Sequence, residues 1–186
     1  MKKIARMLII LLMMLVGMGM FGSGSGAEET EELFLAMQAI QFDEPVEIPD
    51  VSLPLVGGET RKLSDFKGSV VLLNFWATWC GYCEKERPSL QALYEKYQKK
   101  GLVIVAVSID RAAIETVEKY LEEHELTFPT LHDQDSDVAG DFGVRGVPST
   151  YFIDASGKAL GGVIGPRDWD SKEGRALVEF LLSQKK

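Results

Sequence analysis

The segment "VVLLNFWATWCGYC", residues 70–83, carries both cysteines of the chain, Cys80 and Cys83. Its first part, "VVLLNF", is a nearly continuous apolar run, which predicts a fully buried strand over 70–75. A short loop follows, and the helix-forming sequence after Cys80 continues to a glycine stop at Gly101. The sequence therefore places two cysteines, three residues apart, at the start of a helix that follows a buried strand.

The position of the pair at a helix start predicts thiol chemistry. A helix N-terminus presents unpaired N–H groups and partial positive charge, which favour the thiolate, the nucleophilic form of cysteine. Cys80 feels this field most and is expected to be the more exposed of the two, while Cys83 lies one turn further on, close enough for a disulfide. We therefore expect Cys80 to attack a partner's disulfide and Cys83 to release that partner by forming a redox-active disulfide with Cys80, without a cofactor.

Three other interpretations of the cysteines remain open. A structural disulfide between Cys80 and Cys83 would close almost no loop and would constrain the unfolded chain little. Half of a zinc site would need two more ligands, and the two histidines, His124 and His132, have a spacing that fits no common zinc pattern. We expect these histidines to be ordinary surface or edge residues, and no bound metal is expected. Inert structural cysteines are the third alternative.

Residues 1–27 differ from the rest of the chain. A basic start precedes the apolar run from Met7 to Phe21, and the small-residue stretch "GSGSGA" follows. This layout predicts a secretory signal peptide cleaved before Glu28. The alternative is an uncleaved membrane anchor, although the apolar run is shorter than the roughly 20 residues that a span needs. Either way, the functional part is expected outside the cytoplasm, in a periplasm or on the outer face of the membrane.

The charge of the chain limits the classes of partner. The net charge is −8, and loss of the three basic residues of the leader brings it to −11. Such an acidic surface repels nucleic acid and argues against a basic membrane-binding face. Residues 28–46 are expected to be an acidic linker, either a short helix or a tether. Residues 47–186 are expected to form one globular domain, long enough to bury a core without a disulfide.

The remaining patterns predict an α/β sandwich around a mixed central sheet. A strand, a helix and a second strand in the first half imply a parallel pair with a crossover helix. Two hairpins are indicated by turn residues, at Gly57–Gly58 and at "ASGK". The expected elements after the first strand are a strand over 102–109, a helix over 112–124, strands over 149–154 and 159–164, and a final amphipathic helix over 172–184.

Two pairs of motifs carry a family resemblance. "VVLLNFWATWCGYC" together with "GVPSTYFID" (146–154) resembles the thioredoxin superfamily. "LSDFKGSVVLLNFWATWC" together with "CGYCEKERP" is similar to its TlpA/ResA-like branch of membrane-tethered or secreted thiol–disulfide oxidoreductases. The likeness covers roughly residues 47–184. It implies a thioredoxin-like sandwich, with helices on both faces of a mixed central sheet and an N-terminal β-hairpin extension.

The resemblance assigns expected roles around the cysteines. Pro148 falls on the family's cis-proline and would face the cysteine pair, the alternative being a plain trans turn proline. The backbone of Val147 would then pair with an extended substrate segment. Trp79 is expected to stand beside Cys80 on the surface and to supply apolar area for substrate binding, whereas Trp76 is expected in the core. Pro88 is expected to kink the helix that begins at Cys80.

Glu86 is the polar residue from which most can be inferred. With Leu90 and Tyr97 it follows helical spacing on the inward stripe, three residues after Cys83. A half-buried carboxyl has a raised pKa and could take a proton from the resolving thiol, so Glu86 is a candidate catalytic residue beside the cysteines. The branch carries a glutamate here, whereas conventional thioredoxins place an aspartate where this chain has Asn74. The alternative is a solvated glutamate in the charged run "EKER".

The expected function is that of an extracytoplasmic thiol–disulfide oxidoreductase. The resemblance implies protein thiols and disulfides as substrates, such as those of apocytochrome c during cytochrome c biogenesis, and a membrane-embedded electron donor. Gly81-Tyr82 leaves the direction of electron flow open. One alternative is a peroxiredoxin-like thiol peroxidase, for which Thr78 is present but no proline lies within 70–80. The other is a non-catalytic binding module that uses the groove beside Trp79 and Pro148.

Overall fold

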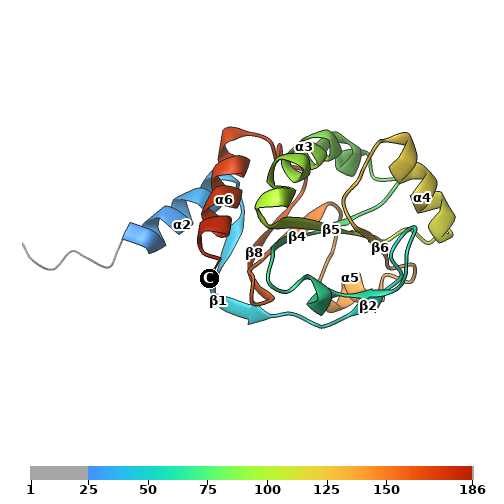
Figure 1. The fold of residues 1–186 in the computed structure, drawn as a ribbon, viewed down its shortest axis with the longest axis horizontal. Helices are drawn as coiled ribbons and strands as arrows, with labels where there is room; N and C mark the ends of the chain where they lie inside the picture. Colours follow the sequence, from blue (N-terminus) through green and yellow to red (C-terminus); the bar gives the residue numbers. More distant parts are fainter. Residues whose placement is uncertain (1–24, 186) are drawn as a thin grey trace, which may run out of the picture.

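A six-stranded mixed sheet runs through the molecule (Figure 1). The structure is a computed structural model that describes residues 25–185. The strand order is β1-β8-β7-β4-β5-β6. The strands are β1 (Ile40–Glu47), β4 (Val70–Trp76), β5 (Leu102–Ser108), β6 (Thr130–His132), β7 (Ser149–Ile153) and β8 (Lys158–Ile164). A separate antiparallel pair joins β2 (Ser52–Leu53) to β3 (Arg61–Lys62), which confirms the expected N-terminal hairpin.

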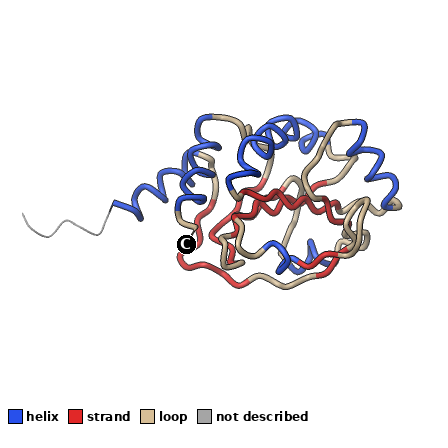
Figure 2. The backbone as a smooth tube through the Cα atoms, viewed as in Figure 1, coloured by secondary structure: helices blue, strands red, loops and turns tan. Residues whose placement is uncertain are grey.

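Helices cover both faces of the sheet, as predicted (Figure 2). One face carries α2 (Ser25–Ala36), α3 (Gly81–Tyr97), α4 (Ile114–Glu123) and α6 (Lys172–Ser183). The other face carries α5 (Asp137–Asp141), the short helix η1 (Leu63–Phe66) and the β2–β3 hairpin. A further short helix, η2 (Gln98–Lys100), links α3 to β5.

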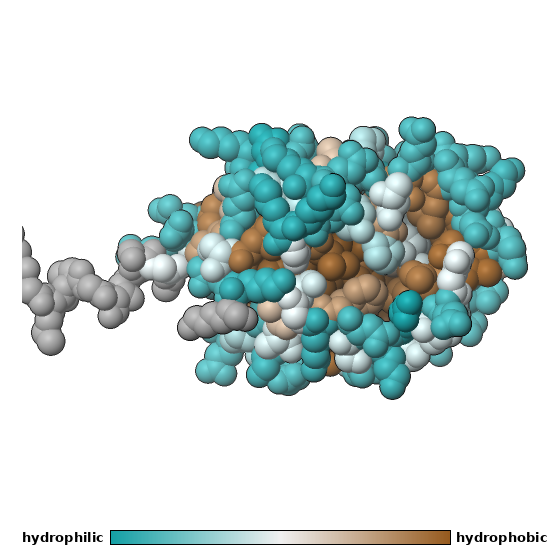
Figure 3. Space-filling view, in the orientation of Figure 1, coloured by the Kyte–Doolittle hydropathy of each residue, from teal (hydrophilic) through white to brown (hydrophobic). Residues whose placement is uncertain are grey.

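The central strand β4 explains why the core has two halves. All of its residues are buried, and alternate side chains point to opposite faces of the sheet. Leu72 and Trp76 join the core under α3 and α6, whereas Leu73 and Phe75 join the core over α5 and η1. A buried apolar run therefore produces a strand covered on both sides. In Figure 3, hydrophilic side chains cover most of the visible face, and apolar ones gather near its middle.

The topology places the cysteines at one end of the sheet. β4 and β5 are parallel and are joined through α3, while β7 pairs antiparallel with both β4 and β8. This confirms the predicted crossover helix between two parallel strands and the predicted hairpin at "ASGK". Since α3 begins where β4 ends, Cys80 lies at the carboxyl end of the central strand, the edge at which open α/β sheets build their sites. Helix α3 continues through Pro88.

The N-terminal part differs from the expected linker over 28–46. Helix α2 and strand β1 occupy this range, and β1 pairs antiparallel with β8. Gly161 on β8 permits the contact, because a side chain there would collide with the Ile40 carbonyl and the Phe34 ring. The pairing register breaks between Gln41 and Val46. The expected leader over 1–27 lies almost wholly outside the described residues, and no helix within 25–185 is long and apolar enough to cross a membrane.

Candidate active site

The two cysteines form a disulfide at the N-terminus of α3, with their Cα atoms 5.3 Å apart. Cys80 is the N-cap residue, and its Sγ accepts a hydrogen bond of 3.1 Å from the backbone N–H of Cys83. This N–H is one of the helix-start donors that would stabilise a thiolate on Cys80. Cys80 is 6 % exposed and Cys83 1 %. Solvent and partners therefore reach Cys80 first, which is the order that an exchange reaction requires.

The loop before β7 lies against the disulfide. The carbonyl oxygen of Val147 is 3.5 Å from Sγ of Cys80, and the Val147–Pro148 peptide bond is cis, as expected. The disulfide has no S–H group to donate, so this distance is a van der Waals contact in the oxidised protein. After reduction, the Cys80 thiol would have this carbonyl as an acceptor. The sequence-predicted neighbours Val147 and Pro148 thus lie beside Cys80.

Two exposed aromatic side chains flank the pair. Trp79 is 68 % exposed and Tyr82 63 %, whereas Trp76 is buried, as predicted. A groove beside Trp79 is lined by Thr78, Ile109, Asp110, Arg111, Ala112 and Ser136. Large apolar side chains left in water next to a groove are typical of surfaces that bind a partner.

Asp110 fixes the loop that carries Trp79. Its carboxylate accepts hydrogen bonds from the Thr78 N–H at 2.9 Å and the Thr78 hydroxyl at 2.5 Å, and also from the Ser108 hydroxyl at 2.7 Å. Asp110 itself is buried, and its backbone carbonyl contacts the ring of His132. Sequence reasoning missed this residue, although a lone aspartate just after a buried strand was an available signal. Two of these donors belong to the loop, and the third, on Ser108 of β5, fixes the carboxylate itself.

Glu86 lies on the buried stripe of α3, as its spacing predicts, and is 2 % exposed. Three N–H groups donate to its carboxylate: Asn74 Nδ2 to Oε1 at 2.9 Å, and the Arg167 backbone N and Trp169 Nε1 to Oε2 at 3.1 and 3.2 Å. Burial raises the pKa of Glu86 to about 6, while the hydrogen bonds oppose this rise. The result is a carboxyl that exchanges its proton near neutral pH, one helical turn from Cys83.

Arg87 is a buried cation that sequence reasoning did not single out. Its guanidinium carbon lies 4.2 Å from the centre of the Trp76 ring and 4.3 Å from that of Tyr120. It also donates to the Ala77 carbonyl at 2.8 Å and to the Tyr120 hydroxyl. Burial lowers the pKa of Arg87 to about 10, so it stays charged at neutral pH. The side chain thereby ties α3 to the loop before Cys80.

The two histidines lie apart from the cysteines. His124 is exposed and stacks on Tyr120, with ring centres 3.9 Å apart. His132 is buried on the outer strand β6, so it is an edge residue but not a surface one. Within residues 25–185, no group of three or more His, Cys, Asp and Glu side chains is arranged to hold a metal ion.

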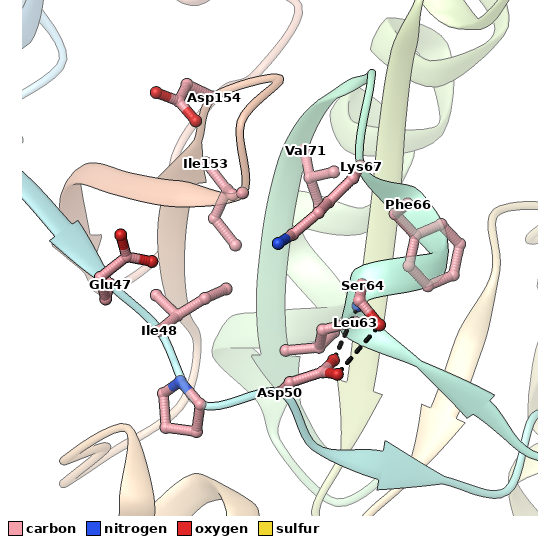
Figure 4. A pocket seen from close by; sticks show the side chains of 12 residues that line it. Glu47, Ile48, Asp50, Leu63, Ser64, Phe66, Lys67, Val71, Ile153 and Asp154 are labelled. Atoms are coloured by element: carbon pink, nitrogen blue, oxygen red, sulfur yellow. Dashed lines mark hydrogen bonds between the residues drawn. The ribbon is translucent and has the colours of Figure 1, made fainter.

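A separate pocket lies at the other end of β4 (Figure 4). Ile48, Leu63 and Ile153 give it apolar walls, and Lys67 points into it from the segment after η1. Val71, near the start of β4, also lines it, whereas the cysteines follow the end of that strand. This pocket is therefore not part of the exchange site.

The sheet, the disulfide at the start of α3 and the cis-proline opposite it together define a thioredoxin-fold protein. Residues 46–159 match the AhpC/TSA family, and the chain belongs to that family. The thiol-disulfide oxidoreductase ResA of Oceanobacillus iheyensis is 41 % identical over 130 residues, which cover 68 % of this chain and 67 % of that protein. ResA of Bacillus cereus is 36 % identical over 128 residues, 69 % and 73 % of the two chains.

Solved structures agree with this assignment. A Chlorobium tepidum protein described as thiol:disulfide interchange protein DsbE superposes with a TM-score of 0.69 at 33 % identity, over 76 % of this chain and 99 % of that one. The thioredoxin domain of a thiol-disulfide oxidoreductase from Bacteroides vulgatus gives 0.65 at 27 % identity, over 75 % and 99 %. The relatives found by sequence and those found by structure are therefore both named as thiol–disulfide exchange proteins.

Proposed function

We propose that the chain is an extracytoplasmic thiol–disulfide oxidoreductase that reduces disulfides in exported proteins. The observation that carries the proposal is a cysteine at a helix N-terminus, the more exposed of the two, followed on the same helix by a second cysteine and a buried carboxyl of raised pKa. The names of the relatives support the reaction class. The predicted leader over 1–27 supports a place outside the cytoplasm, secreted or anchored at the membrane.

The reaction begins with the reduced protein. The Cys80 thiolate attacks one sulfur of a substrate disulfide, forms a mixed disulfide and releases the other substrate sulfur as a thiolate, which takes a proton from water. The Cys83 thiolate then attacks Sγ of Cys80. This second step forms the Cys80–Cys83 bond and releases the second substrate thiolate. Two electrons pass from the protein to the substrate, and the disulfide form described here is the product state.

Glu86 prepares the second step. Cys83 is buried, and its thiol must lose a proton before its sulfur can attack, so the step needs a proton acceptor. With a pKa of about 6, Glu86 is mostly ionised at pH 7 and can accept that proton. A groove lined by Lys85, Pro88, Ser89, Pro166, Arg167 and Asp168 reaches Glu86 and offers a route by which the proton leaves to solvent.

The substrate-binding surface follows from the residues around Cys80. We assign Trp79 as apolar contact area and the Val147 backbone, next to Pro148, as the edge on which an extended substrate segment lies. Exported proteins with exposed disulfides, apocytochrome c among them, have the required chemistry. A membrane-embedded dithiol donor would return two electrons to the Cys80–Cys83 disulfide after each cycle.

Cysteine-to-serine variants test the proposal. The Cys83→Ser variant should trap the substrate as a mixed disulfide on Cys80, because no other cysteine is present to resolve it. The Cys80→Ser variant should trap nothing, and the double variant should lose reduction of insulin disulfides. Full activity of the double variant would contradict the proposal and favour a non-catalytic binding module. Peroxide consumption that outpaces disulfide reduction would favour a thiol peroxidase.

The direction of electron flow is tested by the reduction potential of the pair against glutathione. We expect a value close to about −270 mV, as in thioredoxins, because the protein is proposed to reduce its substrates. A value near about −120 mV would instead assign it to disulfide formation.

A further inference from the structure

Arg167 connects the buried carboxyl of Glu86 to the N-terminal helix α2. Its backbone N–H donates to Oε2 of Glu86 at 3.1 Å. Its guanidinium donates in the opposite direction, from Nε to the Met37 carbonyl at 2.8 Å and from Nη2 to the Gln38 carbonyl at 3.1 Å. One residue in the loop between β8 and α6 thus bridges the candidate proton acceptor and the end of a helix almost 130 residues earlier in the chain.

The end of α2 is built to hold that guanidinium in one place. Met37 and Gln38 directly follow α2, and the partial negative charge at the C-terminus of a helix favours a cation there. The chain leaves α2 through a C-terminal capping turn. In it the Gln38 N–H donates to the Leu35 carbonyl and the Ala39 N–H donates to the Phe34 carbonyl, both at 2.8 Å. Gln38 has a φ of 51°, a conformation that glycine normally supplies. The Met37 and Gln38 carbonyls therefore form a fixed acceptor pair.

Aromatic packing supports the same carboxylate oxygen by a second route. The Phe34 ring of α2 meets the Phe152 ring edge-on at 5.2 Å, and Phe152 meets the Trp169 ring at 6.1 Å. All three rings are buried, and Nε1 of Trp169 donates to Oε2 of Glu86. The α2 region therefore contacts both residues that donate to Oε2: Arg167 through hydrogen bonds, and Trp169 through the packing of Phe34 and Phe152.

We infer that Arg167 is a positioning residue for thiol–disulfide exchange, and that α2 acts through it to hold the backbone amide which keeps Glu86 a usable proton acceptor. The inference rests on the proposed role of Glu86 and extends it to a segment that the sequence predicted to be an acidic linker, either a short helix or a tether. A carboxylate that loses a donor binds its proton more tightly. The clamp is the pair of hydrogen bonds from the Arg167 guanidinium to the Met37 and Gln38 carbonyls. Its loss should raise the pH at which Glu86 ionises and slow the resolving step at neutral pH.

The other groups near Glu86 set the background against which this shift is measured. Its own helix contributes Lys85 and Arg87, and the loop after β8 contributes Asp168 in addition to Arg167. Strands β4 and β7 contribute only the neutral Asn74 and Thr150. Removing Arg167 removes a positive charge as well as the clamp, so the experiment needs a variant that separates the two effects.

The experiment follows the carboxyl carbon of Glu86 by NMR across a pH titration, in the otherwise unchanged chain with the cysteines oxidised. The resonance is assigned by its absence in Glu86→Gln. The Arg167→Met variant keeps the aliphatic stem and loses the clamp, and should raise the pKa of Glu86 by about one unit. The Arg167→Lys variant keeps the charge but cannot hold two carbonyls in a fork, and should recover only part of that shift. Arg61→Ala, an exposed arginine in the β2–β3 hairpin, should leave the titration unchanged.

Two results would overturn the inference. An unshifted Glu86 titration in Arg167→Met would show that the amide keeps its place without the clamp. Full recovery in Arg167→Lys would assign the effect to charge alone. The proposed function fails separately: full activity of the double cysteine variant would contradict it, and unchanged exchange kinetics in Glu86→Gln would remove the proton-acceptor role, while either result leaves the NMR titration intact. A global loss of stability in Arg167→Met, measured by urea unfolding, would not by itself move the Glu86 titration.

Discussion

The side-chain amide of Asn74 on β4 donates a hydrogen bond of 2.9 Å to Oε1 of Glu86 on α3. Its second N–H donates to the Thr150 hydroxyl, also at 2.9 Å, so both hydrogens of the amide are used. The central strand therefore presents a neutral donor, and not a second carboxyl, to the acid on the helix. In this strand–helix hydrogen bond, Glu86 is the only carboxyl.

Replacing Glu86 by glutamine should change the pH dependence of the resolving step. In the unaltered chain, the rate at which Cys83 attacks the mixed disulfide should rise through about pH 6, as the carboxylate becomes available. The Glu86→Gln variant should lack this rise and follow only the thiol's own ionisation, with a rate at pH 7 on the order of a hundredfold lower. Stopped-flow measurement of product release checks this, and identical profiles would refute the role of Glu86.

The stability of the protein should fall as Glu86 ionises. Its pKa is about 6 in the folded protein against 4.5 as the unperturbed value, so the folded state binds more protons between these two pH values. The stabilisation contributed by this group is fully present below about pH 3.5 and is lost as pH rises through 6, by about 2 kcal/mol in total once pH 7 is passed. Urea unfolding of the unaltered chain and of Glu86→Gln, compared pH by pH, isolates this slope. A parallel pair of curves would contradict it.

An aspartate in place of Asn74 should couple two carboxyls. Asn74→Asp would put a second acid within hydrogen-bond distance of Glu86, and such a pair shares one proton because two charges so close repel. The upper apparent pKa should rise above that of Glu86 alone by at least about one unit. Thiol reactivity followed against pH would show the later inflection. An unmoved midpoint would mean that residue 74 does not act on the site.

Truncation of Trp79 should affect protein substrates selectively. The Trp79→Ala variant loses an exposed aromatic contact beside Cys80, so kcat/KM for a folded protein disulfide should fall by about tenfold. Reduction of a small disulfide such as oxidised glutathione should change little, because the thiol chemistry is untouched. Leu35→Ala, which removes another exposed apolar side chain on α2, is the matched control. Equal losses with both substrates would point to damage at the cysteines.

The sequence predicts the framework well because local patterns determine it. The apolar run over 70–75, the helix start at Cys80 and the inward spacing of Glu86 each depend on neighbours along the chain, and the structure places all three as expected. The cis bond before Pro148 came from the resemblance, not from local pattern. Trp169 and Arg167 were missed because they approach Glu86 from more than 80 residues away and follow no periodic pattern.

The segment over 28–46 could not be assigned from its sequence for a related reason. Its strand begins with a short alternation, Ile-Gln-Phe-Asp, but an acidic residue and Pro45 interrupt the pattern after four residues, and the strand is exposed along nearly its whole length. Its place in the sheet depends on the absence of a side chain at Gly161, a feature of a distant strand. Pairing partners of this kind become visible only in three dimensions.

Strand β1 also determines how the outermost edge of the sheet meets other molecules. An unpaired edge is a template on which further chains can add strands and aggregate. This edge contains Pro45, which has no N–H to offer, together with the acidic Asp43, Glu44 and Glu47. The break in its register adds a local irregularity that a flat incoming strand cannot match. The β1 edge of the sheet is thus protected against the addition of a strand from another chain.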